Sequence, residues 1–213
     1  MTKEISDSSA LKIVKWLADK GLNGVPPLSS AQDLSLEYKI DTSYENDDER
    51  VDSLINWETS KNFTSGFLSG LGGVITLPVT IPSALGASWI IQARMAGAIA
   101  EIYGHSLKED RVRTLVLLSL LGDAGKEVVK QAGIKVGRKM TEQAIKGVSG
   151  KTLAEINKQV GFRLLTKAGE NGVINLTKFV PVVGGLVGGT FDAISCRAVG
   201  RVSKELFAPK KSV

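Results

Sequence analysis

The stretch that decides the fold is Ser65-Gly-Phe-Leu-Ser-Gly-Leu-Gly-Gly-Val-Ile-Thr-Leu-Pro-Val-Thr-Ile-Pro-Ser83, which lies in a run of 32 uncharged residues, 62–93. A helix of roughly 20 apolar residues spans a bilayer, so length alone predicts a transmembrane segment. Pro78 and Pro82 interrupt the run, because proline lacks an N–H donor and biases the preceding residue away from helix. The first arm, 63–77, would reach only about 22 Å as a helix, short of a hydrocarbon core of about 30 Å. The stretch therefore predicts a Pro-broken hairpin, either re-entrant in a membrane or buried in a protein core.

Small residues recur at helical spacing in this hairpin and in a second block. Gly66 and Gly70 are four residues apart and Gly73 follows, while Phe179-Val-Pro-Val-Val-Gly-Gly-Leu-Val-Gly-Gly189 repeats the spacing with Gly184 and Gly188. Such spacing lets two helices approach closely. It also accounts for part of a glycine content of 23 in 213 residues. We expect Gly-rich apolar hairpins at residues 61–104 and 173–207, with these glycines at helix seams.

The rest of the chain shows helical periodicity and little alternation of period two. Ser8 and Ser9 precede a first amphipathic helix, and a Ser29/Ser30 cap precedes a second. Apolar residues at 51, 54 and 55, followed by Glu58, begin a third pattern after a polar loop. The string Ser106-Leu-Lys-Glu109 matches a capping box. Residues 126–170 predict two basic helices broken around 147–150. We expect one all-α, multi-helix domain over residues 1–213.

The uneven distribution of charge along the sequence indicates which class of binding partner the chain can have. The chain carries a net charge of +5, but residues 31–58 hold nine acids against two bases, and residues 126–170 hold ten bases against four acids. Aromatic residues make up 6% and are not interleaved with the bases, so a base-stacking nucleic-acid platform is not supported. We expect no nucleic-acid partner. Membrane lipids or a membrane protein fit the basic segment better.

The single Cys and single His limit the possible chemistry. Cys196 and His105 exclude an internal disulfide and a four-ligand zinc site. The string around Lys126 lacks the first Gly and the Ser or Thr of a phosphate-binding loop. We interpret His105 as a surface turn residue and Cys196 as a small buried apolar residue. No catalytic motif, metal site or cofactor site is indicated, so a binding protein is favoured over an enzyme.

Four charged residues occur within otherwise apolar helical patterns. They are Arg94, Glu101, Asp123 and Asp192. A buried charge without a partner costs several kcal/mol, so we expect these residues to pair with one another or to face a polar cavity. Arg94 and Glu101 are seven apart and share a helix face. The buried polar cluster that they predict either fixes helix register or forms a binding site, and an enzyme centred on Arg94 stays open.

The sequence resembles the EcsC protein family. The resemblance rests on Lys15-Trp-Leu-Ala-Asp-Lys-Gly-Leu-Asn-Gly24, on the central string 65–78, on Gln92-Ala-Arg-Met95 and on Ile99-Ala-Glu-Ile-Tyr-Gly104. It extends from about Trp16 to Phe207. It implies a bacterial, membrane-associated protein of unknown biochemical activity, with an ABC transporter association through the family name alone and no catalytic residues to carry over.

Two functional hypotheses follow from these patterns. In the first, the protein lies at the cytoplasmic, inner face of the cell membrane, where its hairpins insert into or lie against lipid and its basic helices meet anionic headgroups. In the second, it is a soluble helical domain whose hairpins form its own core or enclose an apolar ligand or protein partner. Oligomers are possible in both.

Overall fold

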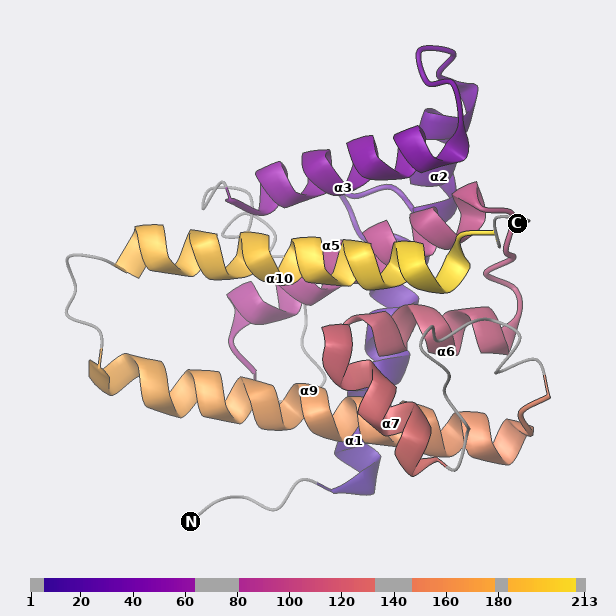
Figure 1. Cartoon of the computed structure of the whole chain (residues 1–213). Helices are drawn as coiled ribbons and strands as arrows, with labels where there is room; N and C mark the ends of the chain where they lie inside the picture. Colours follow the sequence, from indigo (N-terminus) through magenta and orange to yellow (C-terminus); the bar gives the residue numbers. More distant parts are fainter. Residues whose placement is uncertain (1–5, 64–80, 133–146, 179–183, 210–213) are drawn as a thin grey trace.

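The computed structural model describes the chain over residues 6–63, 81–132, 147–178 and 184–209 (Figure 1), with side chains for 6–60, 81–132, 147–168 and 193–209. These residues form helices and connecting turns, with no strand among them. The all-α prediction is confirmed. The helices are α1 (Asp7–Leu17) with its π-helical continuation η1 (Ala18–Leu22), α2 (Ala31–Ile40), α3 (Asp47–Phe63), α5 (Ser83–Ile102), α6 (Asp110–Ser119), the short 3₁₀ helix η2 (Gly122–Ala124), α7 (Gly125–Gln131), α9 (Gly150–Lys178) and α10 (Gly184–Phe207).

Helix α5 is the centre of the fold. Its residues 86–100 are buried without interruption, because the sequence gives it apolar or small side chains on every face. A helix that is apolar all round has to be covered on all sides. Helices α2, α3, α6 and α10 and the η1 turn all pack against it.

Contacts between side chains fix the directions of three helices. Glu58 meets Arg94 and Asp48 meets Tyr103, so α3 runs antiparallel to α5. Cys196 lies against Met95 and the His105 ring against Phe207, so α10 runs parallel to α5. The C-terminal end of α3 and the start of α10 consequently lie toward the same end of the molecule (Figure 1).

A second layer is built on α9. Helices α1, α6 and α7 pack on α9, and α6 also contacts α5. Figure 1 shows α9 running along the side of the molecule that is opposite α3. The break predicted around 147–150 is confirmed by the start of α9 at Gly150, and α9 continues eight residues beyond the predicted limit of 170.

The helix starts differ in how well local sequence predicts them. The Ser30 cap is confirmed, since Ser30 Oγ accepts from Asp33 N at 3.0 Å and Asp33 Oδ2 accepts from Ser30 N at 3.2 Å. Helix α1 begins earlier than predicted, with Ser6 as its cap. The capping box at Ser106 is wrong, because Ser106 Oγ accepts from Lys108 N in a local turn and α6 begins only at Asp110.

Parts of the two predicted Gly-rich hairpins lie outside the described residues. Gly66, Gly70 and Gly73 fall in 64–80, and Pro181 falls in 179–183. Helix α10 begins at Gly184 and includes Gly188, but the side-chain surroundings of both glycines are outside the description. No helix in the described part of the chain combines the length and apolar character needed to cross a bilayer.

Close glycine contacts do occur, at positions that the sequence analysis did not single out. A Cβ added to Gly161 of α9 would overlap the backbone carbonyl group of Ala10 in α1. A Cβ at Gly200 of α10 would lie 2.7 Å from Ile55 of α3, and one at Gly21 would lie 2.6 Å from Ala93. The absence of a side chain therefore sets the distance between α9 and α1, between α10 and α3 and between η1 and α5.

We predict that Gly161→Ala destabilises the protein by about 1–3 kcal/mol, the range for overpacking a close contact, because backbone atoms of Ala10 block the new methyl group. Gly150→Ala is the matched control, since a Cβ there meets nothing within 4 Å. Urea unfolding of both variants measures the difference. Equal stability of the two variants would contradict a close α1–α9 contact.

Candidate functional site

The most deeply buried charges form an ion pair between α3 and α5. Arg94 Nη2 lies 3.0 Å from Glu58 Oε1, and the two side chains are 4% and 0% exposed. Arg94 Nη1 also donates to Ser29 Oγ at 3.1 Å and lies 3.4 Å from Ser29 O, just before α2. One guanidinium group thus connects α5, α3 and the segment that caps α2.

Glu58 is the partner that the sequence analysis missed. In the sequence, Glu58 belongs to the acidic segment 31–58 and to the third helical pattern. Its position seven residues after Val51 places it on the same helix face as Val51, Leu54 and Ile55, all of which are buried. A carboxylate on a buried helix face was the available signal, because such a group requires a cation nearby.

Two of the other predicted cluster members, Glu101 and Asp123, lie elsewhere with separate partners. Glu101 Oε1 accepts from Leu107 N at 2.9 Å and holds the turn after α5. Asp123 is 60% exposed and pairs with Arg201 at 2.8 Å and Lys126 at 3.3 Å, so the expectation that it is buried is wrong. The physical reason is that Gly122, with φ +58, turns the chain into a surface 3₁₀ helix there. The side chain of Asp192 is outside the described residues.

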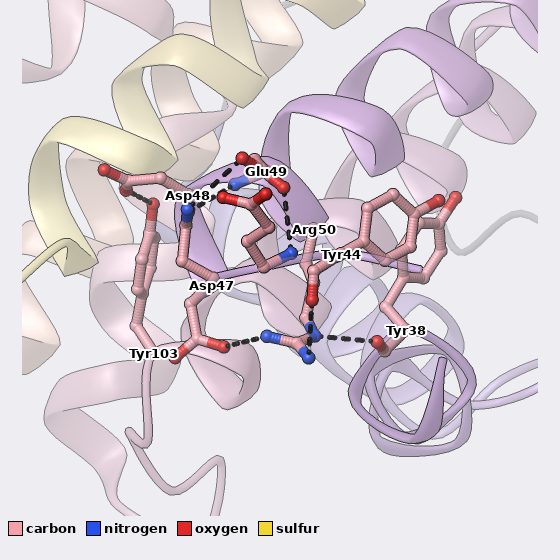
Figure 2. Close-up of polar contacts among 9 residues, drawn as sticks. Tyr38, Tyr44, Asp47, Asp48, Glu49, Arg50 and Tyr103 are labelled. Atoms are coloured by element: carbon pink, nitrogen blue, oxygen red, sulfur yellow. Dashed lines mark hydrogen bonds and ion pairs between the residues drawn. The ribbon is translucent and has the colours of Figure 1, made fainter. Parts of the chain in front are cut away.

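A second polar cluster forms where α3 begins, and Figure 2 shows it. Arg50 donates to Tyr38 O at 3.0 Å and to Asp47 Oδ1 at 3.1 Å, and so holds the start of α3 against the end of α2. Tyr103 Oη donates to Asp48 Oδ1 at 2.7 Å. Lys204 of α10 contacts Asp52 at 2.6 Å. These bonds balance part of the negative charge of segment 31–58 and tie it to α5 and α10.

Two tyrosines of this cluster have shifted pKa values. Burial raises the pKa of Tyr103, and its hydrogen bond to the Asp48 carboxylate raises it further. Burial also raises the pKa of Tyr38 to about 12. Both shifts favour the neutral phenol, which fits a structural role better than proton transfer near neutral pH. Among the described residues, no group of three His, Cys, Asp or Glu side chains is arranged to hold a metal ion.

The two single-copy residues take structural positions. Cys196 is fully buried, with its Sγ 3.9 Å from Met95 Sδ, so its interpretation as a small buried apolar residue is confirmed. His105 is only partly exposed; its Nε2 lies 2.9 Å from Phe207 O and its ring packs on the Phe207 ring. It joins the end of α5 to the end of α10 rather than projecting from a turn.

The surface of the second layer contains a groove of about 860 Å³ between α1, α6 and α9. Helices α1 and α6 each pack on α9 but scarcely touch each other, which leaves the space open. Its apolar lining includes Leu153 and Ala154 of α9, Leu11 and Val14 of α1, and Leu117 of α6.

We predict that Arg94→Met destabilises the protein by about 3–5 kcal/mol, the usual effect of removing one partner of a buried pair, because the Glu58 carboxylate is left buried without its cation. The double variant Glu58→Leu with Arg94→Met should recover most of the loss, since it removes both charges. Urea unfolding of the wild type, both single variants and the double variant gives the coupling energy. Full stability of Arg94→Met alone would show that the pair does not hold α3 against α5.

We also predict that stability declines as the pH rises above about 10, where a free tyrosine ionises. The folded state holds the Tyr103 proton more tightly than the unfolded state, so the stabilisation is complete below the unfolded pKa and is lost above it. Urea unfolding between pH 9 and pH 11 should show a shallower decline for Tyr103→Phe. Tyr44→Phe is the control, because its hydroxyl contacts Ser53 rather than a carboxylate. The same decline in all three proteins would rule out this contribution.

Comparison with known proteins gives one match. The model of the EcsC protein family matches residues 8–208. No curated protein and no solved structure matches the chain. The family match covers nearly the whole chain and confirms the resemblance found in its motifs. The chain belongs to the EcsC protein family.

Proposed function

We propose that the protein binds a lipid bilayer through the end of the molecule at which α3 ends and α5 and α10 begin. The observation that carries the proposal is that the described helices flanking two uncharged sequence segments have their corresponding ends on one side of the molecule. The uncharged run 62–93 and the Gly-rich block 179–189 are far apart in the sequence. Their flanking helices α3, α5, α9 and α10 nevertheless have the corresponding ends toward one side of the molecule, on the left in Figure 1.

The contacts described above support this arrangement. Because α3 is antiparallel and α10 parallel to α5, the C-terminal end of α3 and the N-terminal ends of α5 and α10 face the same way. Only five residues separate the end of α9 from the start of α10, so α9 also ends there. Each of the two chain connections on this side, from α3 to α5 and from α9 to α10, is uncharged in sequence, a composition typical of a membrane-contacting surface.

Exposed apolar side chains occur on the two helices that reach this end. Ile194 of α10 is 70% exposed and Trp57 of α3 is 56% exposed. The two helices that carry them pack together, and Arg197 of α10 donates to Asn56 Oδ1 of α3. Tryptophan is enriched at membrane interfaces, where its ring is apolar and its N–H stays wet. Ile194 and Trp57 therefore add exposed apolar surface to α10 and α3.

The test is flotation of the purified full chain with vesicles of zwitterionic and anionic phospholipid, without detergent. We predict that the wild type floats with the vesicles and that Ile194→Asp reduces the bound fraction several-fold, because a carboxylate resists transfer from water into lipid. Washing with high salt separates the two modes of attachment, since salt screens surface charges but does not release inserted apolar groups.

Ile40→Asp is the matched control. Ile40 is 76% exposed, so the chemical change is the same, but it lies at the end of α2 near the opposite end of the molecule (Figure 1). This variant should bind as the wild type does. If the wild type stays with the soluble fraction, or if both variants lose binding equally, the proposed surface is wrong.

A further inference from the structure

The groove between α1, α6 and α9 has the form of a binding site that is separate from the proposed membrane-contacting end. Its volume, about 860 Å³, falls within the usual range of about 300–1,000 Å³ for small-molecule sites. Its apolar lining includes Leu11, which is 45% exposed although it is a large apolar residue. An apolar ligand in the groove would remove this surface from water.

The acid Asp19 of the groove has hydrogen-bond and ion-pair partners, whereas three cations of the groove have none among the described residues. Lys12 and Lys15 lie one turn apart on the α1 wall, and Arg113 lies on the α6 wall. Within the described part of the chain, none of these three side chains has a hydrogen bond or ion pair. The nearby acid Asp19 already pairs with Lys20 at 3.1 Å and with Asn23 at 3.3 Å. The unneutralised charge of the groove is therefore positive on both walls.

Asp19 interacts with charged groups on both sides of the groove. Its pKa is lowered first by the hydrogen bonds from Lys20 and Asn23 and further by the charges of Lys20 and of Arg113 across the groove. The second acid, Asp110, lies in the first turn of α6, where the helix dipole stabilises a negative charge. An incoming anion would thus meet Lys12 and Lys15, which have no acid partner in the described part of the chain, together with Arg113, whose charge also acts on Asp19.

We propose that this groove binds a free long-chain fatty acid, with its carboxylate between Lys12, Lys15 and Arg113 and its acyl chain along Leu153 and Ala154 of α9. The dimensions favour an acyl chain over a partner helix. The α1 side of the groove extends from Leu11 to Asn23, about 18 Å, whereas the α6 and α9 sides each extend over about two helical turns. An extended alkyl chain fits this length and width, but a helix about 10 Å across would bury only a small contact area.

The test is isothermal titration of the full chain with dodecanoate and with dodecanol, both below their aggregation concentrations. We expect saturable 1:1 binding of dodecanoate. The double variant Lys12→Gln with Lys15→Gln should weaken dodecanoate binding about tenfold, which corresponds to about 1.4 kcal/mol, and leave dodecanol binding unchanged. Lys108→Gln with Lys130→Gln is the matched control, because these two exposed lysines lie outside the groove, and it should bind dodecanoate as the wild type does.

A variant that fills the groove tests the position of the acyl chain. Ala154→Trp should abolish binding of both ligands, and because Ala154 is exposed the urea unfolding midpoint of this variant should match that of the wild type.

Absence of saturable binding, equal weakening by the two lysine pairs, or full binding by Ala154→Trp would overturn the proposal. Equally tight binding of zwitterionic lysophosphatidylcholine would also overturn it, because the cations would then select nothing. Ile194→Asp should leave dodecanoate binding intact, so failure here is distinct from failure of the membrane proposal.

Discussion

The burial of residues 86–100 of α5 is the constraint on which the rest of the structure depends. Its long uninterrupted buried stretch gives it no face that can meet water, so the fold is stable only when other elements enclose it. Four helices and the η1 turn do so, and most of the hydrophobic free energy of this layer comes from that enclosure. The other helices need only one apolar stripe each. Their outer faces can therefore carry the uneven charge of the chain.

The Arg94–Glu58 pair makes this enclosure specific. Apolar contacts alone allow a helix to slide or rotate with little penalty, because many packings bury similar areas. The buried guanidinium group of Arg94 can reach both Glu58 and Ser29 in one register only. Any slip of α3 or α5 would leave a charge buried without its partner, which is far less favourable than an imperfect apolar contact. The pair thus selects one packing, whether or not it adds net stability.

Sequence patterns predicted the features that depend on nearby residues. The all-α class, the Ser30 cap and the break before Gly150 follow from spacing within a few residues. The burial of Arg94 followed from its apolar neighbours, but its partner Glu58 is 36 residues away and only the packing of α3 on α5 identifies it. The prediction that Asp123 is buried was wrong because it relied on the apolar residues before it in the sequence. Gly122 turns this segment to the surface. Gly161 carries no sequence signal at all, since its role depends on where α1 crosses α9.

The open groove follows from the same balance of apolar and charged groups. Helices α1 and α6 both bury apolar residues against α9, and the hydrophobic effect alone would also draw them together. Closing the gap between α1 and α6 would remove Lys12, Lys15 and Arg113 from water, and the groove has too few acids to pair with all three. The free-energy cost of desolvating these cations exceeds the gain from burying more apolar area. The cations therefore keep the groove open. A bound anionic amphiphile would meet both requirements, because its apolar chain covers the apolar lining of the groove and its charged group pairs with the cations.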